Sequence, residues 1–131
     1  MALEHGELTE KIIGAAIEVH RRLGPGFLES IYENALVLEL EKNGLSVRQQ
    51  VPLSVAYDGV EIGVHRLDLF VNDTIVVELK AIKALEDVHF AVVRSYLRAS
   101  GCEHGLLMNF AKVTLQVKRV RANRHTDNDS D

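Results

Sequence analysis

The sequence predicts an α/β protein in which helices flank a mixed β-sheet. The chain begins with two segments in which apolar residues recur at helical spacing, and three strand-like segments with alternating apolar residues follow. A third helical segment and two more strands complete the order. The chain has 131 residues and is 47% hydrophobic, which suits one ordinary domain with a buried core. Elements in this order pack as a sheet covered by helices.

The first helix is expected over residues 8–23, where apolar residues form one stripe. Thr9 is the predicted N-cap, and Leu8 would pack on Ile13 as a hydrophobic staple. The sequence Gly24-Pro25-Gly26 then ends the helix.

A second helix is expected over residues 28–43, with Gly44 just past its end. Glu29 and Glu33 are four residues apart and therefore share a face beside the apolar stripe. They are either a solvated acidic face or part of an acidic site. The residues expected to be buried are Leu28, Tyr32, Ala35 or Leu36, and Leu40.

Residues 47–57 form the first expected strand, and Pro52 favours an edge position or a bulge there. The turn signal Asp58-Gly59 leads back into a strand that continues to the centre of the chain. His65 and Arg66 on that strand could face a substrate phosphate, or they could be ordinary exposed strand residues.

The segment from Arg66 to Ala81 is the central hairpin, with its turn at residues 72–74. A three-residue loop sets the strand register that leaves one face of the hairpin wholly apolar. In that register Asp68, Glu78 and Lys80 are neighbours on the other face. The predicted cross-strand pairs are Arg66 with Lys80, Leu67 with Leu79, Asp68 with Glu78, Leu69 with Val77, Phe70 with Val76, and Val71 with Ile75.

Two neighbouring carboxylates repel each other, and a divalent cation would resolve that repulsion. Mg²⁺ is commonly held by one or two carboxylates together with waters and substrate phosphate. The alternative is a solvated strand face in which Lys80 forms a salt bridge with Glu78.

The third helix is expected over residues 86–100, and strands are expected over residues 105–110 and 113–118. Tyr96 on this helix is either a core residue or a residue at the site. A short basic run would either touch nucleic acid or protect an edge strand. Its members are Lys118, Arg119, Arg121 and Arg124. The predicted domain spans residues 1–124, and residues 125–131 form a polar tail.

The composition argues against several classes of protein. The net charge of −4 and the pI of about 5.8 are unlike those of a protein that binds nucleic acid by charge alone. The single cysteine, Cys102, allows neither an internal disulfide nor a zinc site. The N-terminus lacks the pattern of a signal peptide, and no apolar run approaches the roughly 20 residues of a membrane span. A cytoplasmic protein without membrane contact is therefore expected.

Asp68, followed on the next strand by Glu78-Leu79-Lys80, resembles the D…(D/E)xK signature of the PD-(D/E)XK nuclease superfamily. The segment from Gly26 to Leu36 resembles the hallmark of the small GxxExxY family within that superfamily. The resemblance extends over roughly residues 10–120. Its other matching segments are Gly24-Pro25-Gly26, His65-Arg66-Leu67-Asp68, Val77-Glu78-Leu79-Lys80-Ala81, Tyr96-Leu97 and Gly105-Leu106-Leu107-Met108-Asn109-Phe110.

The resemblance implies a restriction-endonuclease-like core with a Mg²⁺ (or Mn²⁺) site that hydrolyses phosphodiester bonds. Asp68 and Glu78 would bind the metal with the backbone carbonyl of Leu79, Lys80 would orient or activate the water, and Glu33 would complete the site. Possible supporting residues are Glu29, His65, Arg66 and Tyr96. DNA is the implied substrate, with RNA as an alternative, and a homodimer or a larger complex is a further expectation.

The chain departs from the family pattern at one position of the third helix. Family members commonly carry His-x-Ala-Gln there, whereas this chain has His89-Phe90-Ala91-Val92. The missing glutamine implies weak or absent cleavage. A non-catalytic nucleic-acid-binding or accessory protein that keeps the nuclease fold is therefore the alternative function.

Overall fold

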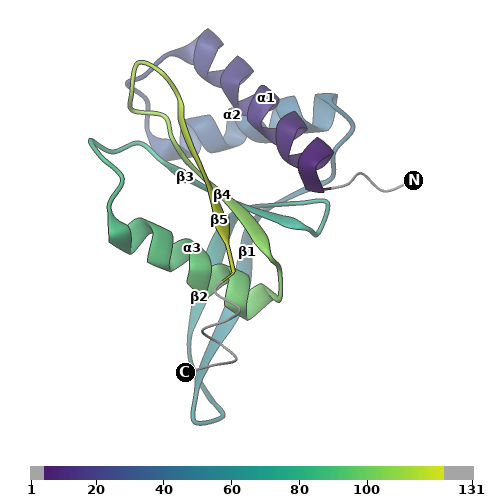
Figure 1. The fold of residues 1–131 in the computed structure, drawn as a ribbon, viewed down its shortest axis with the longest axis vertical. Helices are drawn as coiled ribbons and strands as arrows, with labels where there is room; N and C mark the ends of the chain where they lie inside the picture. Colours follow the sequence, from purple (N-terminus) through teal and green to yellow (C-terminus); the bar gives the residue numbers. More distant parts are fainter. Residues whose placement is uncertain (1–4, 123–131) are drawn as a thin grey trace.

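The computed structural model describes residues 5–122, and these form a five-stranded sheet with three helices (Figure 1). The order of helices and strands is the one predicted from the sequence. The elements are α1 (His5–Leu23), α2 (Glu29–Lys42), β1 (Val47–Tyr57), β2 (Val60–Val71), β3 (Ile75–Lys80), α3 (Asp87–Ser100), β4 (His104–Asn109) and β5 (Gln116–Arg121).

The strands lie in the order β1-β2-β3-β4-β5, so the sheet follows the chain. β3 and β4 are parallel, whereas the other three neighbouring pairs are antiparallel. The parallel pair requires a crossover connection, and α3 provides it. The fold is thus α/β with a mixed sheet, as predicted, and β1 with Pro52 lies at the sheet edge.

Helices cover both faces of the sheet, with α1 and α2 on one side and α3 on the other (Figure 1). The first core lies under α1 and α2 and includes Leu69, Val77 and Leu106 from the strands. The second lies under α3 and includes Phe70 and Val76. Alternate residues of β2 and β3 near the turn therefore enter different cores, as the period of two of a strand requires.

The predicted register of the central hairpin is confirmed next to its turn. Val71 pairs with Ile75, Phe70 with Val76, and Leu69 with Val77. The three-residue loop places both Asn72 and Asp73 at a φ of 51°. These residue types tolerate that left-handed conformation best after glycine.

The ladder between β2 and β3 ends at the pair Leu69–Val77, so the three predicted pairs beyond it are absent. The prediction for Leu67 was also wrong, because its side chain packs in the second core and not on the face of Leu69. The strands separate here because a side chain, and not a strand, binds the N–H of Leu79.

Three details at element ends differ from the predictions. Thr9 is not the N-cap of α1 and Leu8 does not form a staple, because α1 already includes His5. Both residues lie within the helix, and their side chains are buried. Leu28 is 74% exposed instead of buried, since it occupies the N-cap position of α2. The last strand begins at Gln116, where pairing with β4 starts, and Val113 lies exposed in the loop before it.

Part of the predicted basic run and the predicted tail lie outside the described residues, namely Arg124 and residues 125–131. Among the helices of residues 5–122, none combines the length and the apolar character needed to cross a lipid bilayer.

Gly105 sets how closely α3 approaches the sheet. A Cβ atom there would lie 3.0 Å from Cγ1 of Val93 and 3.3 Å from the carbonyl oxygen of Val76.

We expect Gly105→Ala to lower the free energy of unfolding by about 1–3 kcal/mol, because it overpacks this contact. The matched control is Gly14→Ala on the exposed face of α1, where nothing lies within 4 Å. It should raise stability by about 0.5–1 kcal/mol. Urea unfolding measures both, and a neutral Gly105→Ala would contradict the tight packing.

Candidate functional site

Asp68, Glu78 and Lys80 lie together where the β2–β3 ladder opens. The carboxylate of Asp68 accepts the N–H of Leu79 through Oδ2 at 2.9 Å, in place of a strand partner. Glu78 is only 6% exposed, and its Oε2 lies 3.8 Å from Nζ of Lys80. The three residues that the hairpin register predicts as neighbours are therefore neighbours in the structure.

Burial dominates the electrostatics of this pair of acids. It raises the pKa of Glu78 to about 8, and the charge and hydrogen bonding of Asp68 add to the rise, while Lys80 opposes it. Burial also raises the pKa of Asp68, whereas the N–H of Leu79 lowers it. At neutral pH the metal-free pair thus retains a proton, because two adjacent buried carboxylates cannot both ionise easily.

Glu78 also has an oxygen without a partner. Its Oε1 is buried and accepts no hydrogen bond from the described residues. An unsatisfied buried acceptor is costly, and a bound cation would satisfy it while neutralising the excess negative charge. This orphaned oxygen is the observation that makes the site fit a divalent metal.

The donor set is small. Within residues 5–122, no three His, Cys, Asp or Glu side chains are grouped so that they could hold a metal ion. Asp68 and Glu78 supply two carboxylates, a number that suffices for Mg²⁺ when waters and phosphate complete its shell. The carbonyl of Leu79 and the carboxylate of Glu33 remain predicted ligands, although Glu33 is not grouped with Asp68 and Glu78 as a third carboxylate ligand in this structure.

Glu33 from α2 points to the same region but is held by amide groups. Its carboxylate accepts hydrogen bonds from Nε2 of Gln49 at 3.0 Å and from Nε2 of Gln50 at 3.0 and 3.1 Å. The Gln50 amide also lies 3.3 Å from Oδ1 of Asp68, so it bridges the two acids. The charge of Glu33 nevertheless contributes to the raised pKa of Asp68.

Gln50 is a site residue that the sequence did not reveal. Its φ of 51° is in the left-handed region, and the β1–β2 ladder has no pair at this residue. A bulky residue in that conformation indicates local strain, which often accompanies functional sites. The sequence gives only a weak signal here, the two adjacent polar residues Gln49 and Gln50 inside a strand pattern. Glutamine does not favour a left-handed backbone, so the residue type does not predict this conformation.

Glu29 reaches the other end of the cluster. Its Oε2 accepts the N–H of Ala81 at 3.3 Å, just beyond β3, and its charge contributes to the raised pKa of Glu78. The two glutamates of α2 therefore flank the acidic pair, with Glu33 on the side of Asp68 and Glu29 on the side of Glu78. This arrangement favours the acidic-site interpretation of α2 over a solvated face.

The remaining predicted residues surround the pair from α3 and β2. Tyr96 is 7% exposed, and burial together with the charges of Glu78 and Asp68 raises its pKa to about 12. The ring of His65 meets the Tyr96 ring edge-on at 5.0 Å. The guanidinium of Arg66 donates a hydrogen bond to the carbonyl oxygen of Gln50 at 3.4 Å and not to a carboxylate of the acidic pair.

Val92 lies one helical turn before Tyr96 and packs, partly buried, against the second core. It shares the helix face that approaches the acidic pair, because residues four apart stack on one side of a helix. The position of the missing glutamine therefore lies on the same helix face as Tyr96 and holds an apolar side chain.

The chain belongs to the PD-(D/E)XK nuclease superfamily, whose family model matches residues 6–120. A solved structure titled "Crystal structure of SSO0001" shares the fold with a TM-score of 0.54 and 18% sequence identity. The match covers 71% of this chain and 49% of that one, so the chain spans about half the length of that protein. No curated protein matches the sequence significantly.

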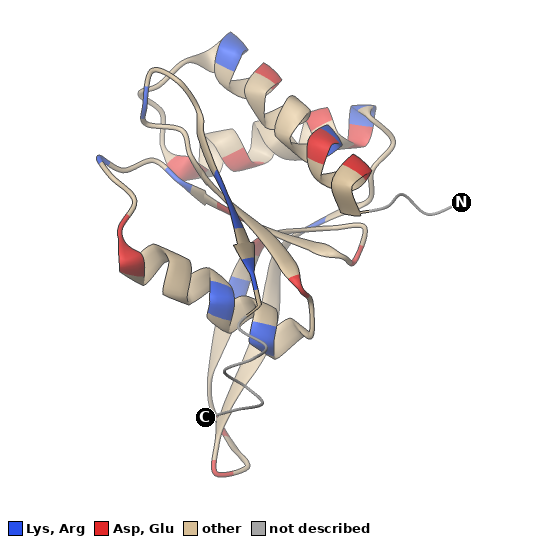
Figure 2. Cartoon of the chain, viewed as in Figure 1, with Lys and Arg blue, Asp and Glu red and all other residues tan. Residues whose placement is uncertain are grey.

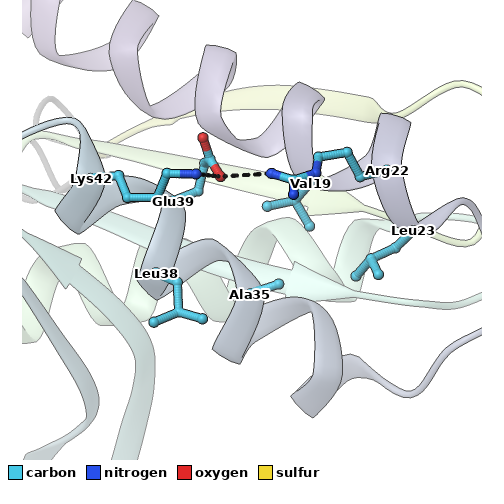
Figure 3. A pocket seen from close by; sticks show the side chains of 7 residues that line it. All are labelled: Val19, Arg22, Leu23, Ala35, Leu38, Glu39 and Lys42. Carbon is cyan, nitrogen blue, oxygen red and sulfur yellow. Dashed lines mark hydrogen bonds and ion pairs between the residues drawn. The ribbon is translucent and has the colours of Figure 1, made fainter.

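A separate hollow of about 280 Å³ lies between α1 and α2 (Figure 3). Apolar residues line it, including Val19, Ala35 and Leu38, and Glu39 forms ion pairs with Arg22 and Lys42 beside it. Asp68, Glu78 and the flanking Glu29 and Glu33 do not line this hollow, so it is not part of the candidate site.

Gln50→Ala should lower the free energy of unfolding by about 1–3 kcal/mol, because the buried Glu33 loses its bridging donor. Gln50→Gly removes the same amide but accepts a positive φ, so it should be less destabilising than the alanine variant. Urea unfolding of both variants separates the hydrogen bonds from the backbone strain. A glycine variant no more stable than the alanine variant would contradict the strain.

Glu78→Gln should leave the metal-free protein equally or more stable, because it removes the repulsion with Asp68. The gain should grow with pH. Since the pKa of Glu78 is raised, its favourable contribution is complete below about pH 4.5, the ordinary value, and is lost as the pH rises through about 8. Urea unfolding with a chelator at about pH 5 and about pH 9 tests this. A loss of several kcal/mol would instead identify Glu78 as a structural partner of Lys80.

Proposed function

We propose that the protein is a Mg²⁺-dependent nuclease that hydrolyses DNA phosphodiester bonds at the Asp68–Glu78–Lys80 site. The observation that supports this most is the buried acid pair with an orphaned oxygen beside a lysine. The family makes phosphodiester hydrolysis the expected chemistry. Mn²⁺ is an alternative ion, and RNA is an alternative substrate.

In this proposal the metal is held by Asp68 and Glu78, with the carbonyl of Leu79 and Glu33 as further predicted ligands. A bound Mg²⁺ supplies charge stabilisation for the phosphate. Lys80 has a side chain that is 25% exposed, so its ammonium can also bind a water or a phosphate oxygen from solvent. Its proposed role is to orient or activate the attacking water.

Residues around the acid pair prepare the site. Gln50 and the N–H of Leu79 fix the two oxygens of Asp68, so this carboxylate keeps one orientation. The hydroxyl of Tyr96 is protonated at neutral pH, since its pKa of about 12 lies above even the ordinary value of 10, and it can therefore donate a hydrogen bond to a phosphate. A preoriented polar group costs little reorganisation during reaction.

Basic residues on α3 and β5 support a nucleic acid as the substrate. Arg94 and Arg98 lie on α3, and Lys118, Arg119 and Arg121 lie on β5, which packs along α3 (Figure 2). Phosphate contacts from such residues supply most non-specific affinity for nucleic acid.

A non-catalytic nucleic-acid-binding or accessory protein is the second candidate, and Val92 favours it. The glutamine common in the family would place an amide on the helix face that approaches the acid pair. With valine there, the carboxylate ligands are intact while a polar support of the reaction is missing. This candidate retains metal binding without efficient cleavage.

The test is cleavage of plasmid and oligonucleotide DNA with Mg²⁺, with Mn²⁺ and with a chelator. Glu78→Gln and Lys80→Met should each reduce cleavage by about 100-fold or more, since removing one group that stabilises the transition state has effects of that order. Glu10→Gln and Lys11→Met on the exposed face of α1 are matched controls. Val92→Gln should raise cleavage. Calorimetric Mg²⁺ binding without cleavage would favour the accessory protein, and a folded protein with neither property would overturn the proposal.

A further inference from the structure

A second hollow, of about 330 Å³, lies between the β1–β2 ribbon and α3. Its volume is at the lower end of the range of small-ligand sites, roughly 300–1,000 Å³. It contains none of the proposed metal ligands. Its lining residues are Ser54, Val55, Ala56, His65, Ser95, Arg98 and Ala99.

His65 connects this hollow to the acid pair. Its side chain lines the hollow, and its ring lies against the ring of Tyr96 at 5.0 Å. Tyr96 in turn is close enough to Glu78 and Asp68 for their charges to raise its pKa. His65 and Tyr96 therefore lie between the hollow and the acid pair.

The hollow has a local backbone irregularity at its wall. The register between β1 and β2 shifts between Val55 and Ala56, so that Val55 faces Gly63 and Ala56 faces Glu61. Both Val55 and Ala56 line the hollow. Bulges of this kind bend a strand and redirect side chains, and they are common next to active sites.

The chemistry of the walls suits a flat ring with polar edges and an adjoining anion. Val55, Ala56 and Ala99 provide apolar surface. The hydroxyl of Ser54 donates to Glu61 at 2.7 Å and that of Ser95 to the carbonyl of Val92 at 2.6 Å, so each retains lone pairs that can accept. Arg98 is exposed at the hollow and can bind a phosphate.

We propose that this hollow holds one unstacked nucleotide of a single-stranded nucleic acid, with the base against the apolar wall and a phosphate on Arg98. A single strand is favoured because its bases enter a pocket freely, whereas a duplex must first lose pairing and stacking. The link to cleavage rests on the proposed nuclease function, but the binding itself does not.

The experiment measures binding in a chelator, where no metal-dependent cleavage occurs. Fluorescence anisotropy compares a labelled single-stranded oligonucleotide with its duplex, and a nucleoside 5′-monophosphate and inorganic phosphate serve as competitors. Ala99→Leu fills the hollow and should weaken single-strand binding by about tenfold or more, because the base can no longer be buried against the apolar wall. Arg98→Ala should weaken it similarly. Ala91→Leu on α3 and Lys11→Ala on α1 are exposed, matched controls that should change it by less than about twofold.

Three other outcomes would overturn the proposal, and a fourth separates it from the nuclease function. Unchanged binding by Ala99→Leu would exclude the hollow, and Ala56→Leu on the opposite wall serves if Ala99→Leu fails to fold. Competition by phosphate as strong as by the mononucleotide would show an anion site without base recognition. Equal loss of duplex binding would contradict the single-strand preference. A wild-type protein that binds as expected but never cleaves would refute the nuclease function while sustaining the nucleotide site.

Discussion

The bond between the Asp68 carboxylate and the N–H of Leu79 determines the geometry around which the other site residues are placed. It takes a backbone donor that strand pairing would otherwise use, and so the β2–β3 ladder opens beyond Leu69 and Val77. Asp68 and Glu78 lie at this opening, although burial and their mutual repulsion make it costly to ionise both. Gln50 stabilises the same arrangement from β1, at the expense of a strained backbone.

Much of the fold was predictable because strand and helix patterns are local. The alternation around residues 72–74 predicted the hairpin register, and that register predicted the proximity of Asp68, Glu78 and Lys80. Element ends were less predictable: Thr9 is a good cap by residue type, but α1 continues past it and buries it. Tertiary packing overrides such local preferences.

The sequence could not predict how α2 and β1 meet the hairpin. Glu29 and Glu33 were indistinguishable by spacing, yet the first binds the N–H of Ala81 and the second binds the amides of Gln49 and Gln50. Leu67 enters the second core because the strand departs from regular alternation at Asp68, and no residue there signals it. Long-range polar contacts of this kind have no periodicity in a single sequence.

The short connection between β2 and β3 has a consequence for the kinetics of folding. A hairpin closed by three residues forms early, while Asp68 and Glu78 are still hydrated and their repulsion is screened by water. Their desolvation requires α2 and α3 to dock, and we expect this docking to follow the folding transition state. Interactions formed after the transition state alter the rate of unfolding and leave the rate of folding nearly unchanged. We therefore expect the acid pair to shorten the lifetime of the metal-free native state without slowing the formation of that state.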